Sequence, residues 1–243
     1  MTYKARFQNA GAAQHYDEAV YARGSHDSHL NVIEERILMQ VVRQVSAGGR
    51  FRYMDFACGT GRILSIVAPH AEIAVGVDVS GDMLERAKRR VPFATTRRHD
   101  LLATRVVDEA PFDLITAFRF FLNLEPASRD DYFKALAANL ASRASLLVFN
   151  IHGNRDSIRH LARYRYRRVP APMNEMSSRD VETALDRAGL EVVQRWGVGV
   201  LPRSLYTTSM APVAGAVDRL LFSSGVFEGM SQNLIYACRR RFA

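Results

Sequence analysis

The chain has 243 residues, of which 48% are hydrophobic, and this length suits one domain with a substantial buried core. Lysine and arginine outnumber aspartate and glutamate by 33 to 25, and the formal net charge of +8 favours anionic substrates or partners. No apolar run is long enough to span a membrane, and the first residues lack the apolar core of a secretion signal. The two cysteines, Cys58 and Cys238, have no zinc-ligand spacing and cannot build a disulfide framework, so we expect a cytoplasmic protein without a metal centre.

Helix-like and strand-like segments alternate through the first two thirds of the chain. Apolar positions at helical spacing predict helices at 12–22 and 30–46, the second ending at Gly48-Gly49. Short apolar runs then predict strands, with helices between them. In chain order we expect strand 51–57, helix 61–68, strand 72–78, helix 80–90, strand 93–98, strand 112–118, helix 127–141 and strand 145–151.

The alternation becomes irregular after residue 151. Residues 152–176 are rich in arginine and proline, and residues 197–231 contain several glycines and prolines around a short apolar helix. The remaining elements that we expect are helix 179–188, strand 190–196, helix 213–221 and strand 233–239. Strands that alternate with helices at this spacing predict an α/β protein with a doubly wound sheet.

A glycine turn flanked by carboxylates is the most informative pattern. Residues 54–62 read Met-Asp-Phe-Ala-Cys-Gly-Thr-Gly-Arg, and Asp78 ends the next predicted strand. The glycines let the backbone approach a ligand, the following helix offers free N–H groups, and a carboxylate can accept from both hydroxyls of a ribose. The dinucleotide fingerprint needs a third glycine where this chain has Leu64, and no Walker-type phosphate loop occurs. Asp55, an acid before the turn, suits a ligand with an amino group better than a pyrophosphate.

Four motifs in this order resemble those of the class I S-adenosylmethionine-dependent methyltransferases. Residues 54–62 resemble the family's first motif, residues 78–84 its second, residues 98–101 its third and residues 112–118 its fourth strand, so the match covers roughly residues 50–151. The resemblance implies a Rossmann-like, seven-stranded mixed sheet whose seventh strand is antiparallel and lies beside the fifth. It implies S-adenosylmethionine as the cofactor, with contacts from Tyr16, Asp55, Ala57, Cys58, Gly59, Thr60, Gly61, Asp78, Val79, Met83, Asp100, Leu101 and Phe118.

The resemblance also suggests roles for single residues. Asp55 would face the cofactor's amino group, Asp78 the ribose and Asp100 the adenine amino group, although Asp100 could instead be a helix N-cap. Met83 would lie beside the adenine or in the core. Cys58 reads as a small turn residue and not as a nucleophile.

Acceptor-side residues are expected where the fourth and fifth strands end. Phe118 or Phe120 would present an aromatic face to the sulfonium, and Arg119 would meet an anionic acceptor or pair with an acid such as Glu125. His152 is the candidate general base, because the unperturbed imidazole pKa is about 6.5.

The N-terminal segment resembles the family's lid, with Tyr16 over the cofactor and His15 on the substrate side, or else it is a helix that only packs. We expect one methyltransferase domain over residues 1–243, with a helical lid at 1–48, a cofactor-binding half at 49–151, and a substrate-side half at 152–243 whose cap segments are 152–176 and 197–231.

The sequence thus predicts methyl transfer to a small or medium polar acceptor by in-line displacement, giving S-adenosylhomocysteine, with oxygen favoured over nitrogen because of His152. The net charge is compatible with RNA, but residues 117–120 lack the Pro-Pro pattern of amino-base methylases, so nucleic acid is disfavoured. Arginines within 155–168 form either a solvated face or a rim that attracts an anionic acceptor. A glycan or lipid acceptor at a membrane surface, suggested by residues 201–227, and a non-catalytic S-adenosylmethionine-binding subunit remain alternatives.

Overall fold

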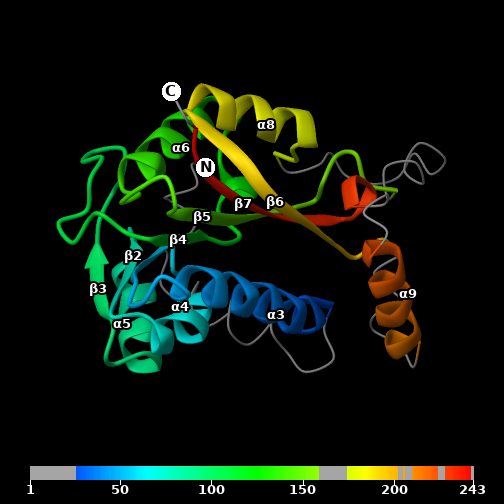
Figure 1. Ribbon diagram of the computed structural model, residues 1–243, viewed down its shortest axis with the longest axis horizontal. Helices are drawn as coiled ribbons and strands as arrows, with labels where there is room; N and C mark the ends of the chain where they lie inside the picture. The colour runs from blue at the N-terminus through cyan, green and yellow to red at the C-terminus, as the bar shows by residue number, and fades with distance from the viewer. Residues whose placement is uncertain (1–25, 159–173, 202–204, 206–209, 224–227, 242–243) are drawn as a thin grey trace.

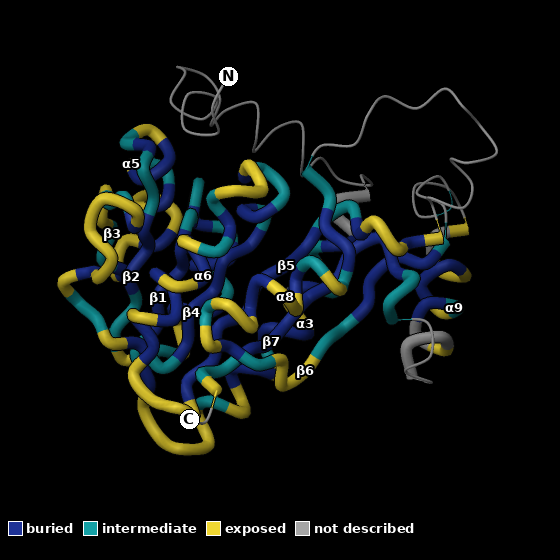
Figure 2. Tube along the Cα trace, turned by 90° about the horizontal axis from the view of Figure 1, so that it is seen from above, coloured by how far each residue is buried: buried dark blue, intermediate teal, exposed yellow. Residues whose placement is uncertain are grey.

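A single seven-stranded sheet forms the centre of the computed structural model, which describes residues 26–158, 174–201, 205, 210–223 and 228–241. The strands are β1 (Arg52–Phe56), β2 (Ile73–Asp78), β3 (Thr95–Arg98), β4 (Leu114–Ala117), β5 (Leu146–His152), β6 (Leu190–Val198) and β7 (Asn233–Arg240). The residues of β1, β4 and β5 are almost all buried, as expected of strands covered on both faces. Figure 2 shows this buried centre with exposed residues around it.

The strand order is β3-β2-β1-β4-β5-β7-β6. Strands β1 to β5 are parallel to one another, whereas β7 pairs antiparallel with both β5 and β6. The mixed, doubly wound sheet and the antiparallel strand beside the fifth confirm the predicted fold. The order reverses between β1 and β4, and ligands of such sheets bind at the carboxyl ends of the strands near that reversal.

Helices cover both faces of the sheet. They are α3 (His26–Ser46), α4 (Arg62–Val67), α5 (Gly81–Arg90), α6 (Arg129–Ala138), α8 (Ser178–Arg187) and α9 (Ala211–Ser223). Figure 1 places α3, α4 and α5 on one face and α6 and α8 on the other. Each face has its own apolar core, and the core beneath α6 and α8 contains the stacked pairs Phe121–Phe133 and Phe149–Tyr236.

The largest differences from the predicted helix boundaries are in α3 and α6. Helix α3 begins at His26, four residues before the apolar stripe that starts at Leu30. The predicted helix 127–141 is shorter, because α6 ends at Ala138 and the next residue, Asn139, bonds to distant parts of the chain. Its Nδ2 donates to the Arg105 carbonyl and its Oδ1 accepts from the backbone N–H of Val107. The predicted helix 12–22 lies outside the described residues.

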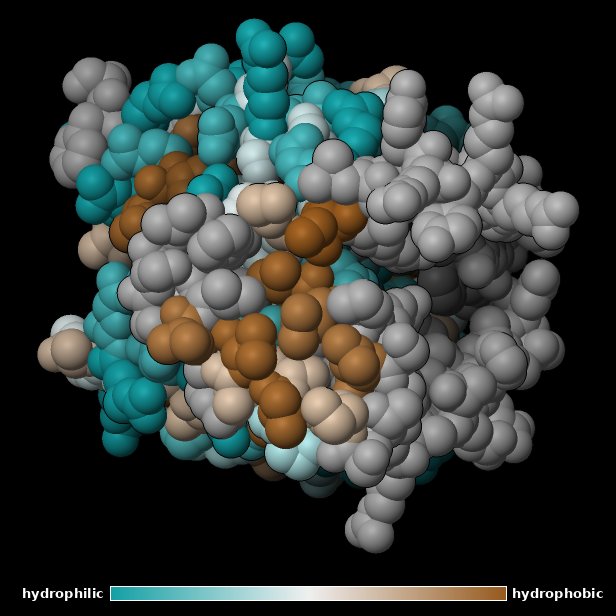
Figure 3. Space-filling view, turned by 90° about the vertical axis from the view of Figure 1, so that its right-hand side faces the viewer, coloured by the Kyte–Doolittle hydropathy of each residue, from teal (hydrophilic) through white to brown (hydrophobic). Residues whose placement is uncertain are grey.

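Helix α9 lies at one end of the molecule and buries one acid. Its Asp218 is buried and accepts a hydrogen bond from the backbone N–H of Val200, at 3.2 Å. Of the side chains that the structure describes on and beside this helix, the exposed ones are apolar, among them Met210, Val213 and Leu220, and Figure 3 shows apolar side chains gathered over this end. No helix of the described segments is both long and apolar enough to cross a membrane.

Candidate active site

A small open pocket lies where β1, β2 and β3 end. It is lined by Phe56, Ala57, Asp78, Val79, His99, Asp100, Leu101, Phe120 and Tyr132. The structure therefore brings together five of the residues that the sequence assigned to the cofactor: Ala57, Asp78, Val79, Asp100 and Leu101. The sequence pattern did not indicate Phe56 and Tyr132, because an aromatic residue in a strand or helix resembles an ordinary core residue, nor did it indicate His99, which lies in the loop after β3.

The turn between β1 and α4 needs glycine at two positions. Gly61 precedes α4 with φ of 82°, and a Cβ there would lie only 3.0 Å from the Cα of Ala87, so glycine lets α4 pack closely on α5. Gly59 has φ of 55°, and its backbone N–H donates to Asp78 Oδ2 at 2.9 Å. A Cβ on Gly59 would meet no atom within 4 Å, so that side of the turn is open.

Asp78 connects the turn to the end of β2. Its Oδ2 accepts from Gly59, and its Oδ1 accepts from the backbone N–H of Ser80 at 2.9 Å. Burial raises the pKa of Asp78, while these backbone N–H groups oppose the increase. A carboxylate oxygen has more than one acceptor position, so both oxygens can still accept from a ribose. The carboxylate oxygens of Asp78 are thus compatible with a nucleoside bound at this edge of the sheet.

Three aromatic rings form one wall of the pocket. Phe120 meets Phe56 and Tyr132 edge to face, with ring centroids 4.8 Å apart in each pair. Phe120, which the sequence placed on the acceptor side, belongs to the same pocket lining as Asp78 and Asp100. Burial and the nearby charge of Asp100 raise the pKa of Tyr132 to about 12, so its hydroxyl stays protonated. An aromatic wall beside a carboxylate suits a purine with an exocyclic amine.

Asp55 is a buried acid with one oxygen unpaired. Its Oδ1 accepts from the Thr116 hydroxyl at 2.7 Å, and that hydroxyl accepts from the Tyr53 hydroxyl at 2.7 Å. Asp55 Oδ2 makes no hydrogen bond of normal geometry in the described part of the chain, although the backbone N–H of Leu64 is near enough to this carboxyl to lower its pKa. Burial raises the pKa of Asp55 to about 7, against the opposing effects of Thr116 and Arg62. A buried carboxylate oxygen without a donor is compatible with a bound ammonium group, the role predicted for Asp55.

The raised pKa of Asp55 predicts a pH dependence. Since its pKa in the folded state exceeds that of the unfolded chain, its ionisation costs stability progressively from about pH 4 to about pH 7. In urea unfolding, we expect the wild type to lose stability relative to Asp55→Asn over this range. If Asp55 contacts the cofactor's ammonium group, S-adenosylhomocysteine affinity of the wild type rises with pH through about 7, and that of the variant does not. Parallel pH profiles for the two proteins in both measurements would contradict the assignment.

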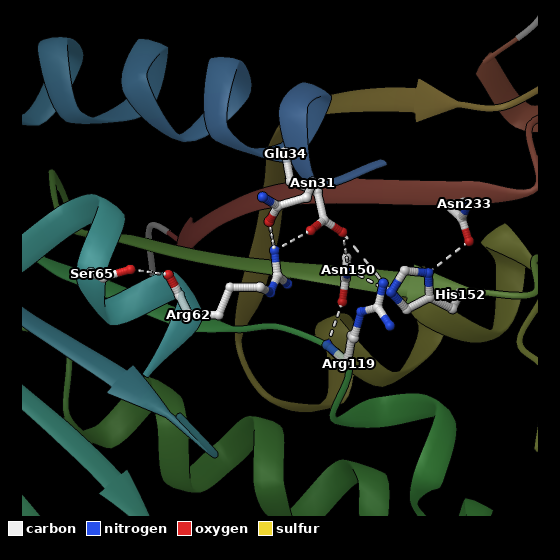
Figure 4. Close-up of polar contacts among 8 residues, drawn as sticks. All are labelled: Asn31, Glu34, Arg62, Ser65, Arg119, Asn150, His152 and Asn233. Atoms are coloured by element: carbon white, nitrogen blue, oxygen red, sulfur yellow. Dashed lines mark hydrogen bonds and ion pairs between the residues drawn. The ribbon is translucent and has the colours of Figure 1, made fainter. Parts of the chain in front are cut away.

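A second polar cluster, which we call the Glu34 network, lies where β4 and β5 end (Figure 4). Glu34 of α3 is 2% exposed, and its Oε2 accepts from Arg62 at 2.7 Å. Its Oε1 accepts from Asn150 Nδ2 at 2.9 Å. Burial alone would raise the pKa of Glu34, but the charges of Arg62, His152 and Arg119 lower it below its usual value. Glu34 is therefore an ionised carboxylate that connects α3 to the start of α4.

The Glu34 network brings together two of the predicted acceptor-side residues. His152 is the last residue of β5, with Nδ1 2.8 Å from Asn233 Oδ1 and Nε2 3.0 Å from Asn150 Nδ2. The backbone N–H of Arg119 donates to Asn150 Oδ1 at 2.6 Å. The network is connected to the pocket through the chain, since Arg119 precedes Phe120 of the pocket lining. Sequence reasoning missed Glu34, Asn150 and Asn233, which are polar residues inside apolar segments.

The remaining predicted residues lie apart from the pocket lining. Phe118 packs in the core beneath α3, and Met83 is buried in α5. Thr60 accepts a hydrogen bond from Arg90. Burial raises the pKa of the Cys58 thiol well above its usual value, which agrees with a turn residue and not a nucleophile. His15 and Tyr16 lie outside the described residues.

Backbone strain is concentrated at this edge of the sheet. Of the non-glycine residues that the structure describes, Ala57 and Arg119 have positive φ, at 53° and 57°. They follow β1 and β4, the two strands between which the sheet order reverses. Strained residues of this kind cluster at functional sites, where surrounding contacts hold them in place.

The sheet order and the pocket at its carboxyl edge define the Rossmann-like fold of class I S-adenosylmethionine-dependent methyltransferases. Residues 25–195 match a family model described as a methyltransferase domain, and the chain belongs to this family of S-adenosylmethionine-dependent enzymes.

Solved structures show the same fold at low sequence identity. Magnesium protoporphyrin IX methyltransferase from Synechocystis PCC 6803, with bound S-adenosylmethionine, has a TM-score of 0.64 and 14% identity, covering 99% of this chain and 98% of that one. N-methyltransferase NodS from Bradyrhizobium japonicum WM9, in complex with S-adenosylhomocysteine, has a TM-score of 0.58 and 15% identity, covering 99% and 97%. An S-adenosylmethionine-dependent methyltransferase from Mesorhizobium loti has a TM-score of 0.55 and 20% identity, covering 83% and 96%. No curated protein sequence matches the chain significantly.

Proposed function

We propose that this methyltransferase acts on an oxygen atom of a small or medium polar acceptor, held where β4 and β5 end. The observation that carries the proposal is the position of His152. His152 is the last residue of β5, and its side chain is 14% exposed. Its Nε2 lies 3.9 Å from the Glu34 carboxylate. A histidine beside a buried carboxylate suits the removal of a proton from a hydroxyl, because the carboxylate stabilises the imidazolium that forms.

The cofactor-side residues have positioning roles in this proposal. Asp78 accepts from the ribose hydroxyls, the wall of Phe56, Phe120 and Tyr132 packs on the purine, and Asp55 faces the ammonium group. When bound, S-adenosylmethionine supplies a methyl group on a sulfonium, whose departing thioether is neutral and needs no acid. The chain's main task is to align the acceptor oxygen and exclude water, which can contribute about 7–11 kcal/mol to lowering the barrier.

His152 would take the hydroxyl proton at Nε2, and Arg119 would attract an acceptor that carries negative charge. The net charge of +8 also attracts negatively charged acceptors over long distances.

A lipid-linked acceptor at a membrane surface is the second candidate, favoured by one observation. Helix α9 exposes apolar side chains such as Val213 and Leu220, and apolar side chains gather over this end of the molecule (Figure 3). Co-sedimentation with anionic vesicles, compared between wild type and Leu220→Ser, tests this candidate. Equal binding of the two proteins, or none, would remove it.

The test of the oxygen proposal is a methyl-transfer assay with labelled S-adenosylmethionine and matched alcohol, carboxylate and amine acceptors. With the best alcohol acceptor, we expect His152→Asn to lower kcat by about 100-fold or more, with S-adenosylhomocysteine affinity unchanged. Turnover confined to amines would replace oxygen by nitrogen. An unchanged kcat in His152→Asn would remove the proposed base.

A further inference from the structure

The hydrogen bonds around His152 determine which ring nitrogen carries the proton. Asn150 Oδ1 accepts from the backbone N–H of Arg119, so the other atom of this amide is the nitrogen. Its two hydrogens point to Glu34 Oε1 at 2.9 Å and to His152 Nε2 at 3.0 Å. Nε2 must therefore accept, which leaves the proton on Nδ1, where Asn233 Oδ1 accepts it at 2.8 Å.

We propose that Asn150 and Asn233 are positioning residues for methyl transfer, which hold His152 as the neutral Nδ1–H tautomer with the lone pair of Nε2 directed into the Glu34 network. The inference rests on the proposed function, in which Nε2 receives the acceptor's proton. Asn150 is 1% exposed and Asn233 is 7% exposed, so solvent does not compete strongly for either amide. The tautomer is thus set by two strands, β5 and β7, that pair with each other.

Charged groups of both signs surround the ring. Arg119, after β4, and Arg62, at the start of α4, carry positive charge toward the network and disfavour an imidazolium. Glu34, from α3, favours it at 3.9 Å. A proton arriving at Nε2 would displace the Asn150 donor and place the new N–H near the Glu34 carboxylate. Asn150 also accepts a hydrogen bond from the strained backbone of Arg119. The same side chain therefore fixes the His152 tautomer and the conformation of the loop after β4.

Long-range nitrogen–proton NMR of the full chain tests this tautomer directly. His152 is assigned from the signals lost in His152→Asn. We expect the wild-type ring to show the neutral Nδ1–H pattern at pH 7.5. In Asn150→Asp, the carboxylate can still accept from Arg119 but cannot donate to Nε2. His152 should then carry a proton on Nε2, with its pKa raised by about one unit or more.

Two further variants complete the design. Asn233→Asp should keep the Nδ1–H tautomer, because a carboxylate accepts that proton more strongly, and should also raise the pKa of His152. Asn139→Asp is the matched control, since Asn139 is a fully buried amide with three hydrogen bonds in α6 and its surroundings. This control is expected to change stability and leave the His152 tautomer and pKa unaltered.

A wild-type His152 with its proton on Nε2 overturns the inference. This measurement uses the wild-type protein, so it decides the question even if a variant fails to fold. A folded Asn150→Asp protein with an unchanged tautomer and pKa also overturns it. Activity separates this inference from the proposed function. If NMR shows the Nδ1–H tautomer but His152→Asn retains full turnover of an alcohol acceptor, the base assignment and the catalytic purpose of the two asparagines both fail.

Discussion

Replacing Asp78 by alanine is expected to weaken S-adenosylhomocysteine binding by about 100-fold or more in titration calorimetry. Hydrogen bonds to a charged group contribute about 1.5–3 kcal/mol each, and two ribose hydroxyls would lose their acceptor. At about 1.4 kcal/mol for each tenfold change in affinity, the loss amounts to at least two orders of magnitude. The substitution also removes the acceptor for the backbone N–H groups of Gly59 and Ser80, which loosens the turn itself.

Asp82→Ala is the matched control for Asp78→Ala. Asp82 lies only four residues further on, in the first turn of α5, and its side chain is exposed. We expect its removal to leave S-adenosylhomocysteine affinity unchanged. Asp78→Asn keeps the shape of the side chain and one carbonyl acceptor, so it should lose less affinity than Asp78→Ala. If Asp78→Ala folds and binds like the wild type, Asp78 does not belong to the cofactor site.

Replacing Glu34 by alanine is expected to lower the free energy of unfolding by about 3–5 kcal/mol. The change leaves the Arg62 guanidinium, whose side chain is 14% exposed, without its carboxylate, and removal of one partner from a buried ion pair typically has this cost. Urea unfolding measures the difference. Glu35→Ala is the control, because Glu35 is the next residue of α3 but is exposed, and we expect it to change stability by no more than about 0.5 kcal/mol.

The lowered pKa of Glu34 gives this prediction a pH signature. Because the folded state binds the Glu34 proton less tightly than the unfolded state, the stabilisation is present above the unfolded pKa and is lost as the pH falls below it. The wild type should therefore lose stability below about pH 4.5 more steeply than Glu34→Gln. Equal stabilities of the Glu34→Ala and Glu35→Ala proteins would show that the network contributes nothing to folding.

The order of strands and helices was predictable because its signals are local. The apolar run of residues 145–151 predicted a strand covered on both faces, and β5 is buried over that length. Ser80 predicted the start of α5, and its hydroxyl accepts from the backbone N–H of Met83. The glycine turn and Asp78 were recognisable for the same reason, since a turn and the strand ends around it are short continuous segments.

The Glu34 network was not predictable, because its members are far apart in the chain. Glu34 lies within a helix whose apolar stripe gives no indication that an acid faces inward. Asn150 lies within a continuous apolar strand, and its partners, Arg119 after β4 and Glu34 of α3, come close to it only in the folded protein. The aromatic wall was missed in a similar way, since Phe56 and Tyr132 come from different elements and meet only in the fold.

Strand β7 occupies a place between β5 and β6, both of which precede it in the chain. A nascent polypeptide that has not yet released residues 233–240 from the ribosome therefore has β5 and β6 present with no strand to join them. Each then offers unpaired backbone groups, which favour contacts with other chains. Biogenesis of this enzyme thus includes an interval in which the first five strands can be assembled while His152 still lacks Asn233.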